Sequence, residues 1–220
     1  MSIRRRAGVV VLAFGFWAAC GSNGDTQRNR PPAPFGIEIN APGGTGDPLL
    51  VQSYSDLVGS GFNWAETSFG WGDIEVRPNF FRWDLLDVHL RSARERGVSL
   101  SVAVRLLDNQ TRGSLPVDLV GLWLDDPFFR SRFARFTQEV VLRGTGRIRY
   151  LWIGREADAY LSHNMGEVES FLELIEECQD SAALIDPTVR LGTIVSYDET
   201  LARGSFALSD RLAAAGGALG

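Results

Sequence analysis

A charged turn follows the most strand-like segment of the sequence. Tyr150–Ile153 is an apolar run that ends at Gly154, and Arg155, Glu156 and Asp158 come directly after it. A short apolar run bounded by a turn signal is typical of a buried parallel strand. Proteins built from parallel strands place their chemistry at the carboxyl ends of those strands. We therefore predict that Glu156 is the principal catalytic candidate, with Asp158 as a second choice that faces the following loop.

Other polar side chains lie on or just beyond four further predicted strands. They are Glu38, Glu66, the pair Arg105 and Asp108, and the pair Tyr197 and Asp198. A carboxylate inside a sheet is costly unless it is paired, so Glu38 and Glu66 are expected to reach the rim. Arg105 and Tyr197 are predicted to contact a substrate. For Arg105, a mutual ion pair with Asp108 is the structural alternative.

Strand-like and helix-like segments alternate from Phe35 onward, and no antiparallel hairpin is expected. Strands are predicted at residues 35–39, 62–67, 98–106, 148–153 and 189–195, and helices at 48–58, 84–96, 126–140, 166–185 and 205–215. Such alternation requires a parallel α/β sheet with right-handed crossovers. A doubly wound sheet and a (β/α)8 barrel both satisfy it. The glycines at 43, 44 and 46 lack the spacing of a dinucleotide-binding turn, which disfavours that version of the doubly wound sheet.

Composition and charge limit the classes of partner. Apolar residues make up 45% and charged residues 22% of the 220 positions, as in an ordinary globular domain. The net charge is −5, whereas a nucleic-acid partner would require a basic face. All 22 basic residues are arginines, and they are scattered rather than clustered. We therefore expect no nucleic-acid partner.

The first 34 residues have the pattern of an export signal and a tether. Three arginines at 4–6 precede an apolar run over 7–19 that is too short to span a membrane comfortably, and Cys20 follows small residues. Residues 1–20 resemble a bacterial lipoprotein signal, which implies lipidation of Cys20 and attachment to the cell envelope. A plain secretory signal is the alternative. Residues 21–34 are polar and proline-rich, as in a flexible tether.

The segment after the second strand and the segment after the fourth resemble one known family. Phe69–Glu75 followed by Phe81–Asp84 resembles the "W-x-x-I-E-P…G-x-F-x-W" segment of the clan of (β/α)8-barrel retaining glycoside hydrolases. Tyr150–Leu161 resembles the fourth-strand motif of that clan, in which an apolar strand ends in Asn-Glu. The similarity extends in order from about Phe35 to Tyr197, so residues 35–220 are expected to form about five of the eight βα units of such a barrel.

The resemblance implies a two-carboxylate reaction without a metal or cofactor. A retaining glycosidase uses two carboxyl groups about 5–5.5 Å apart, one as acid/base and one as nucleophile. By position Glu156 resembles the acid/base, and carbohydrate is the implied partner. Trp71 and Glu75 are predicted to line the sugar cleft. Their structural alternatives are packing beneath a loop for Trp71 and pairing with an arginine for Glu75.

Two departures from the clan pattern bear on activity. Arg155 stands where the clan has an Asn that binds the sugar 2-hydroxyl, and a cation beside Glu156 should lower the pKa of a proton donor. The clan nucleophile lies on a seventh strand, and only five units are recognised in this sequence. We therefore expect no hydrolysis by these 220 residues unless the reading frame continues. A carbohydrate- or partner-binding envelope lipoprotein is the alternative function.

The remaining histidines and cysteine suggest no further chemistry. His89 is expected on a solvated helix face, and His163 lies in the loop after the fourth strand, where it could contact a ligand. Cys178 has a helical, apolar environment and is predicted to be an inert buried thiol. No metal-binding spacing, phosphate loop or Ser-His-Asp set is recognisable.

Overall fold

The computed structural model describes residues 36–39, 48–196, 198, 200–201 and 207–215. Its centre is a parallel sheet of β1 (Gly36–Glu38), β2 (Trp64–Phe69), β5 (Ser99–Asp108), β7 (Ile148–Arg155) and β8 (Arg190–Gly192). These strands lie side by side in the order in which they occur along the chain.

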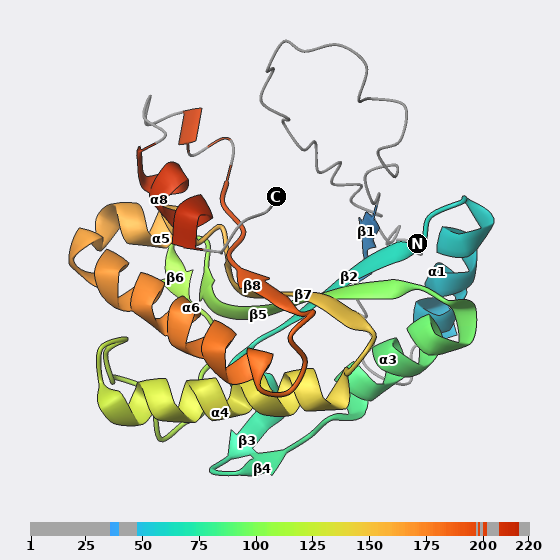
Figure 1. Cartoon of the computed structure of the whole chain (residues 1–220), viewed down its shortest axis with the longest axis horizontal. Helices are drawn as coiled ribbons and strands as arrows, with labels where there is room; N and C mark the ends of the chain where they lie inside the picture. Colours follow the sequence, from blue (N-terminus) through green and yellow to red (C-terminus); the bar gives the residue numbers. More distant parts are fainter. Residues whose placement is uncertain (1–35, 40–47, 197, 199, 202–206, 216–220) are drawn as a thin grey trace, which may run out of the picture.

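The crossover helices form one continuous layer along the sheet (Figure 1). They are α1 (Pro48–Gly59), α3 (Asp84–Arg96), α4 (Pro127–Arg143) and α6 (Val168–Ala183). Contacts join α1 to α3 and α4 to α6, so neighbouring helices pack on one another as well as on the strands. A sheet with sequential strands and helices on one face is the pattern of a (β/α) barrel, because a doubly wound sheet carries helices on both faces. Of the two architectures that the sequence allows, the structure has the barrel type.

Alternation along the strands separates an apolar face from a polar one. On β2, Thr67 points toward the helices, where its hydroxyl contacts His89 of α3. Successive strand residues face opposite sides, so Trp64, Glu66 and Ser68 lie on the other face of the sheet. There the Trp64 indole donates to the Ser101 hydroxyl at 2.7 Å. The face away from the helix layer therefore carries polar and aromatic side chains.

The predicted third crossover helix, over residues 126–140, forms around an aromatic stripe. Asp126 caps α4 by accepting hydrogen bonds from two backbone amides, and Pro127 occupies its first position. Phe129, Phe133 and Phe136 are fully buried, and their rings lie 5.0–5.7 Å from the ring of Trp71. The stripe is core packing, and its rings are not available to a ligand.

Short antiparallel pairs were not expected from the sequence, and that expectation is wrong. After the short helix α2 (Trp71–Ile74), β3 (Glu75–Arg77) pairs with β4 (Phe80–Phe81), and β6 (Thr111–Arg112) folds back on β5. Both turns use an asparagine with positive φ, Asn79 at 59° and Asn109 at 56°. Strands of two or three residues are too short to show alternation, so these asparagines were the only local signal.

The predicted export signal, the tether and Cys20 all lie outside the described residues. Among the described residues, no helix is long and apolar enough to cross a membrane. Cys178 is buried with a free thiol, and burial raises the pKa of that thiol to about 12. This agrees with the expectation of an inert cysteine.

Candidate active site

Glu156 follows β7 in a conformation that glutamate rarely adopts. Its φ is 51° and its ψ is 40°, in the left-handed region, and Gly154 two residues earlier has a φ of 88°. The side chain is half-buried and forms no hydrogen bond or ion pair with another described residue. Left-handed backbone at a non-glycine residue costs of order 1 kcal/mol and persists only where neighbours impose it. The Glu156 carboxylate is thus presented by a strained turn and is not used in packing.

The segments that directly follow the two neighbouring strands, β5 and β8, hold this turn in place. The register between β5 and β7 pairs Val104 with Ile153 and then Asp108 with Arg155, so β5 carries two extra residues at this point. The amide of Asn109 donates to the Arg155 carbonyl at 2.9 Å. On the other side the amide of Ala157 donates to the Ile194 carbonyl at 3.1 Å. Irregularities of this kind redirect side chains at strand ends.

Arg155 pairs with Glu38 and not with Glu156. Its Nη1 and Nη2 atoms donate to Glu38 Oε1 and Oε2 at 3.0 and 3.2 Å. The Glu38 side chain is only 5% exposed, so this bidentate pair is largely desolvated. A pairing of Glu156 with Arg155, the structural alternative to a catalytic role for Glu156, is therefore not seen among the described residues, because the Arg155 guanidinium binds Glu38 of β1.

Glu66 adds a third ionisable group beside this pair. It lies directly opposite Glu38 in the register of β1 with β2 and is 8% exposed. Burial raises the pKa of Glu66 to about 7, with a further upward contribution from the Glu38 charge and smaller downward ones from Arg155 and Trp152. The sheet thus carries a carboxyl group that changes its charge near neutral pH.

Arg105 is placed at the end of β5 as expected, with two acidic neighbours. It lies 3.3 Å from Asp108 and 3.6 Å from Asp73. The intramolecular ion pair, the structural alternative for Arg105, is therefore formed. The side chain remains one-third exposed.

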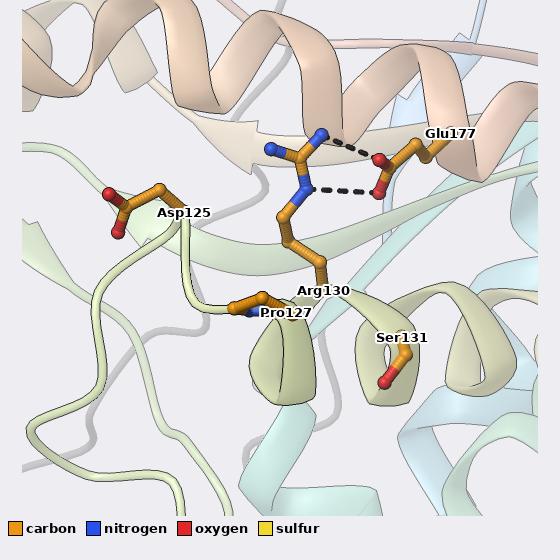
Figure 2. Close-up of a pocket in the computed structure, with 5 residues that line it drawn as sticks. All are labelled: Asp125, Pro127, Arg130, Ser131 and Glu177. Carbon is orange, nitrogen blue, oxygen red and sulfur yellow. Dashed lines mark hydrogen bonds and ion pairs between the residues drawn. The ribbon is translucent and has the colours of Figure 1, made fainter.

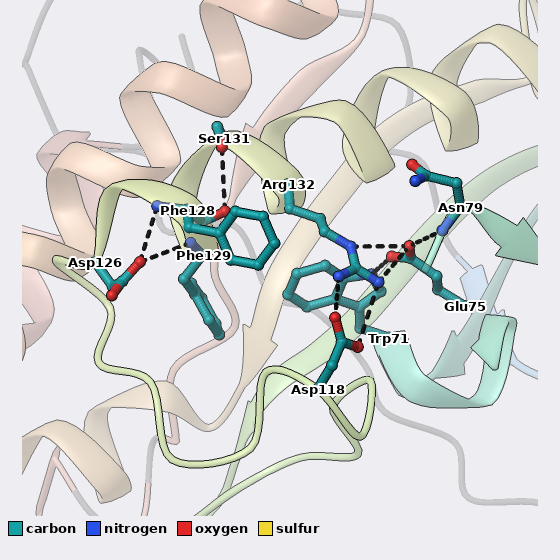
Figure 3. Close-up of polar contacts among 9 residues, drawn as sticks. All are labelled: Trp71, Glu75, Asn79, Asp118, Asp126, Phe128, Phe129, Ser131 and Arg132. Carbon is teal, nitrogen blue, oxygen red and sulfur yellow. Dashed lines mark hydrogen bonds and ion pairs between the residues drawn. The ribbon is translucent and has the colours of Figure 1, made fainter. Parts of the chain in front are cut away.

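Trp71 and Glu75 are fully buried and lie in the packing between α4 and the β3–β4 hairpin. The Trp71 indole donates to Glu75 Oε2 at 2.7 Å, and the Asn79 amide donates to Oε1 at 2.8 Å. Arg132 of α4 donates to the same Oε1 from Nε and Nη2 at 3.0 and 2.8 Å and also pairs with Asp118 (Figure 3). The arrangement matches the structural alternatives for both residues, because both Glu75 oxygens are hydrogen-bonded within the core and the side chain is out of reach of a sugar.

The remaining candidates are divided between core and surface. Asp158 is completely buried and accepts a hydrogen bond from the Ser196 amide at 2.7 Å. It therefore binds the segment that follows β8 to α5 (Ala157–His163). His163 is exposed, with its Nδ1 3.0 Å from the Ala159 carbonyl. Asp198 is exposed, and Tyr197 lies outside the described residues. Among the described residues, no group of acidic, histidine or cysteine side chains is arranged to hold a metal ion.

The expected solvated position of His89 is wrong. The residue is 1% exposed, and its ring nitrogens lie 2.9 Å from the Tyr54 hydroxyl and 3.0 Å from the Thr67 hydroxyl. Burial lowers the pKa of His89 to about 4, so the ring is neutral at pH 7. The helical position alone could not reveal this, because both partners come from other elements.

A cluster beside the candidate acid/base was missed by the sequence analysis. Arg112 on β6 donates to Glu167 at 3.0 Å, and Tyr160 of α5 (Ala157–His163) donates to the other oxygen of Glu167 at 3.0 Å. The Arg112 guanidinium lies 5.7 Å from the ring centroid of Trp123, whose side chain belongs to the long loop before α4 and is 63% exposed. The length of that loop was the only sequence signal for the cluster.

A surface hollow lies in the helix layer, between the start of α4 and α6. It is lined by Asp125, Pro127, Arg130, Ser131 and Glu177, at the start of α4 and on α6 (Figure 2). Arg130 contacts Glu177 through two bonds of 3.0 and 2.6 Å and Glu173 through one of 2.7 Å. This guanidinium has its partners within the protein, so the hollow offers no uncommitted cation to a ligand.

The parallel sheet matches part of the (β/α)8 barrel of glycoside hydrolases. A GH5_18 protein from Streptomyces cattleya, solved with GlcNAc, aligns with a TM-score of 0.57 and 16% identity over 68% of this chain and 40% of its own length. The exo-β-1,4-mannosidase of Opitutaceae bacterium strain TAV5 aligns with a TM-score of 0.59 and 17% identity over 73% and 31%.

A more divergent structure shares the same fold. A family 39 glycoside hydrolase from Bacteroides cellulosilyticus WH2 aligns with a TM-score of 0.56 and 11% identity over 79% of this chain and 36% of its own length. The chain thus spans less than half the length of these three structures. No model of a known protein family and no curated protein matches the sequence. At these identities the likeness establishes the fold.

Proposed function

We propose that this chain provides the acid/base side of a carbohydrate site of the retaining β-glycosidase type, with Glu156 as the acid/base. The observation that carries the proposal is the Glu156 carboxylate, which has no partner among the described residues and lies in a strained turn at the end of the fourth parallel strand. Strain and an uncommitted ionisable group at a strand end are features of functional sites rather than of packing.

The groups around Glu156 suit binding of a neutral, hydroxyl-rich ligand. Arg155 and Glu38 form a bidentate ion pair in which the Arg155 side chain is 28% exposed, and Glu66 lies beside it. Charged groups whose geometry is already fixed can bind hydroxyl groups with little loss of side-chain entropy. The similar structures include a GH5_18 protein solved with Manβ1-4GlcNAc and an exo-β-1,4-mannosidase, which supports β-linked hexosides as the ligand class.

Hydrolysis needs a second carboxylate, which the clan resemblance places on a seventh strand. The five parallel strands described here include no such position. We therefore propose that residues 1–220 by themselves bind oligosaccharides without cleaving them. Arg155, which replaces the sugar-binding Asn of the clan, also favours binding as the function.

Calorimetric titration with Manβ1-4GlcNAc, together with an assay on aryl β-glycosides, tests this proposal. The unmodified chain should bind the disaccharide and release no aryl group, and Glu156→Gln should retain the fold measured by circular dichroism. Turnover that disappears in Glu156→Gln would reveal a second carboxylate within these residues. Failure to bind any β-hexoside would reject the carbohydrate site itself.

Location at the cell envelope through a lipid on Cys20 is part of the same proposal. The chain expressed in a bacterium should partition into detergent and carry a diacylglycerol-modified cysteine detectable by mass spectrometry. Cys20→Ser should abolish the modification. An unmodified chain cleaved elsewhere would instead indicate a plain secretory signal.

A further inference from the structure

We propose that Trp123 is an aromatic platform for a sugar ring of an oligosaccharide that extends away from Glu156. The inference rests on the proposed carbohydrate function and adds to it a preference for longer chains. It is carried by the juxtaposition of an exposed indole on an anchored loop with the cluster of Arg112, Glu167 and Tyr160, whose Tyr160 belongs to the helix that follows Glu156.

The loop around Trp123 is fixed although the ring itself is exposed. Leu124 is 1% exposed, Leu119 is fully buried, and Arg112 Nη1 donates to the Leu122 carbonyl. The Trp123 carbonyl accepts from the Asp126 amide at 3.2 Å, which joins the loop to the cap of α4. A tryptophan that remains 63% exposed between such anchors leaves apolar area in water that a ligand could cover.

A short chain of contacts joins the ring to the turn that carries Glu156. The Arg112 guanidinium lies over the Trp123 ring, Glu167 binds Arg112, and Tyr160 donates to Glu167. Tyr160 lies one helical turn after Glu156, on the helix that begins directly after it. In Figure 1, β6 and α5 lie together at the end of the sheet where β5 and β7 terminate. The platform and the acid/base candidate therefore belong to one rim.

The chemistry of this cluster fits a carbohydrate. A pyranose ring has an apolar C–H face that packs on an indole, and its hydroxyl groups bind to guanidinium and carboxylate groups at the edge of the ring. The exposed indole supplies the apolar surface, while Arg112 and Glu167 supply polar groups next to it. A disaccharide held at Glu156 would leave the platform empty, whereas a longer β-1,4-linked chain would cover it.

Titration with a short and a long probe tests the platform. We expect Trp123→Ala to weaken binding of β-1,4-mannohexaose about tenfold and to leave the affinity for Manβ1-4GlcNAc unchanged. Trp123→Phe should retain part of the preference for the longer chain. Leu184→Ala, which truncates an 81% exposed side chain just after α6, is the matched surface control and should change neither affinity.

The results of these titrations distinguish failure of the Trp123 platform from failure of the carbohydrate site. If the unmodified chain binds both probes and Trp123→Ala lowers both affinities equally, or neither, the platform is rejected and the carbohydrate site stands. If the unmodified chain binds neither probe, the carbohydrate function fails and the platform with it. The indole N–H resonance of Trp123, assigned from Trp123→Phe, should shift with mannohexaose and remain unchanged with the disaccharide.

Discussion

The backbone of Glu156 stores conformational strain that a smaller residue would relieve. Its φ of 51° is a region that glycine enters without penalty. We expect Glu156→Gly to raise the free energy of unfolding by about 1 kcal/mol, measured by urea denaturation. Glu156→Ala retains a Cβ and should show no such gain. Equal stabilisation by both changes would trace the effect to removal of the charge instead.

Two buried groups should give this chain opposite pH dependences that offset each other. Burial lowers the pKa of His89 from 6.5 to about 4, so the unfolded state binds its proton more tightly and stability is lost as the pH falls through this range. Burial raises the pKa of Glu66 from 4.5 to about 7, so the folded state binds that proton more tightly and stability is gained as the pH falls. Each contributes up to about 3 kcal/mol.

Removing either group should reveal the pH dependence of the other. As the pH falls from 7 to 4.5, the His89→Gln variant should become more stable. Over the same fall in pH, the Glu66→Gln variant should become less stable. Denaturant titrations at several pH values measure both slopes. Slopes of the same sign in the two variants would show that one of these residues titrates near its ordinary pKa in the folded chain.

Among elements, α4 is joined to β3 by a buried ion pair in addition to its aromatic packing. Arg132 and Glu75 are 9% and 1% exposed, and Arg132 also reaches Asp118 in the loop that carries Trp123. Arg132→Met should cost about 3 kcal/mol, because it leaves the Glu75 charge buried and unpaired. The double variant Arg132→Met/Glu75→Gln should be more stable than Arg132→Met alone. Equal or lower stability of the double variant in urea denaturation would contradict this account.

Most of the order of strands and helices along the chain could be predicted from the sequence. Most of the side-chain contacts between those elements could not. The five parallel strands and the crossover helices follow from apolar patterns and caps such as Asp126 with Pro127, which are local in sequence. The bond from Arg155 to Glu38 spans 117 residues, and the contacts of His89 span 35 and 22. Such partners depend on strand order and register, which no local pattern contains.

For the whole molecule, the position of each strand in the sheet should determine how slowly its backbone amide hydrogens exchange with solvent. β5 and β7 each pair with strands on both sides, whereas β1 and β8 are three-residue strands at the edges. We expect backbone amides of β5 and β7 to exchange most slowly in deuterium-exchange mass spectrometry, and those of β1 and β8 to exchange fastest. Uniform protection across all five strands would indicate that the sheet opens only by global unfolding.

The match between strand order and chain order has a consequence for synthesis. Within the described sheet, each new parallel strand adds to the edge formed by the strand before it, and none inserts between two earlier ones. A nascent chain leaving the ribosome amino-terminus first can therefore complete one strand–helix unit on the previous unit while translation continues. The sheet can grow in the same direction as the polypeptide, so early units need not wait for distant sequence before they begin to pack.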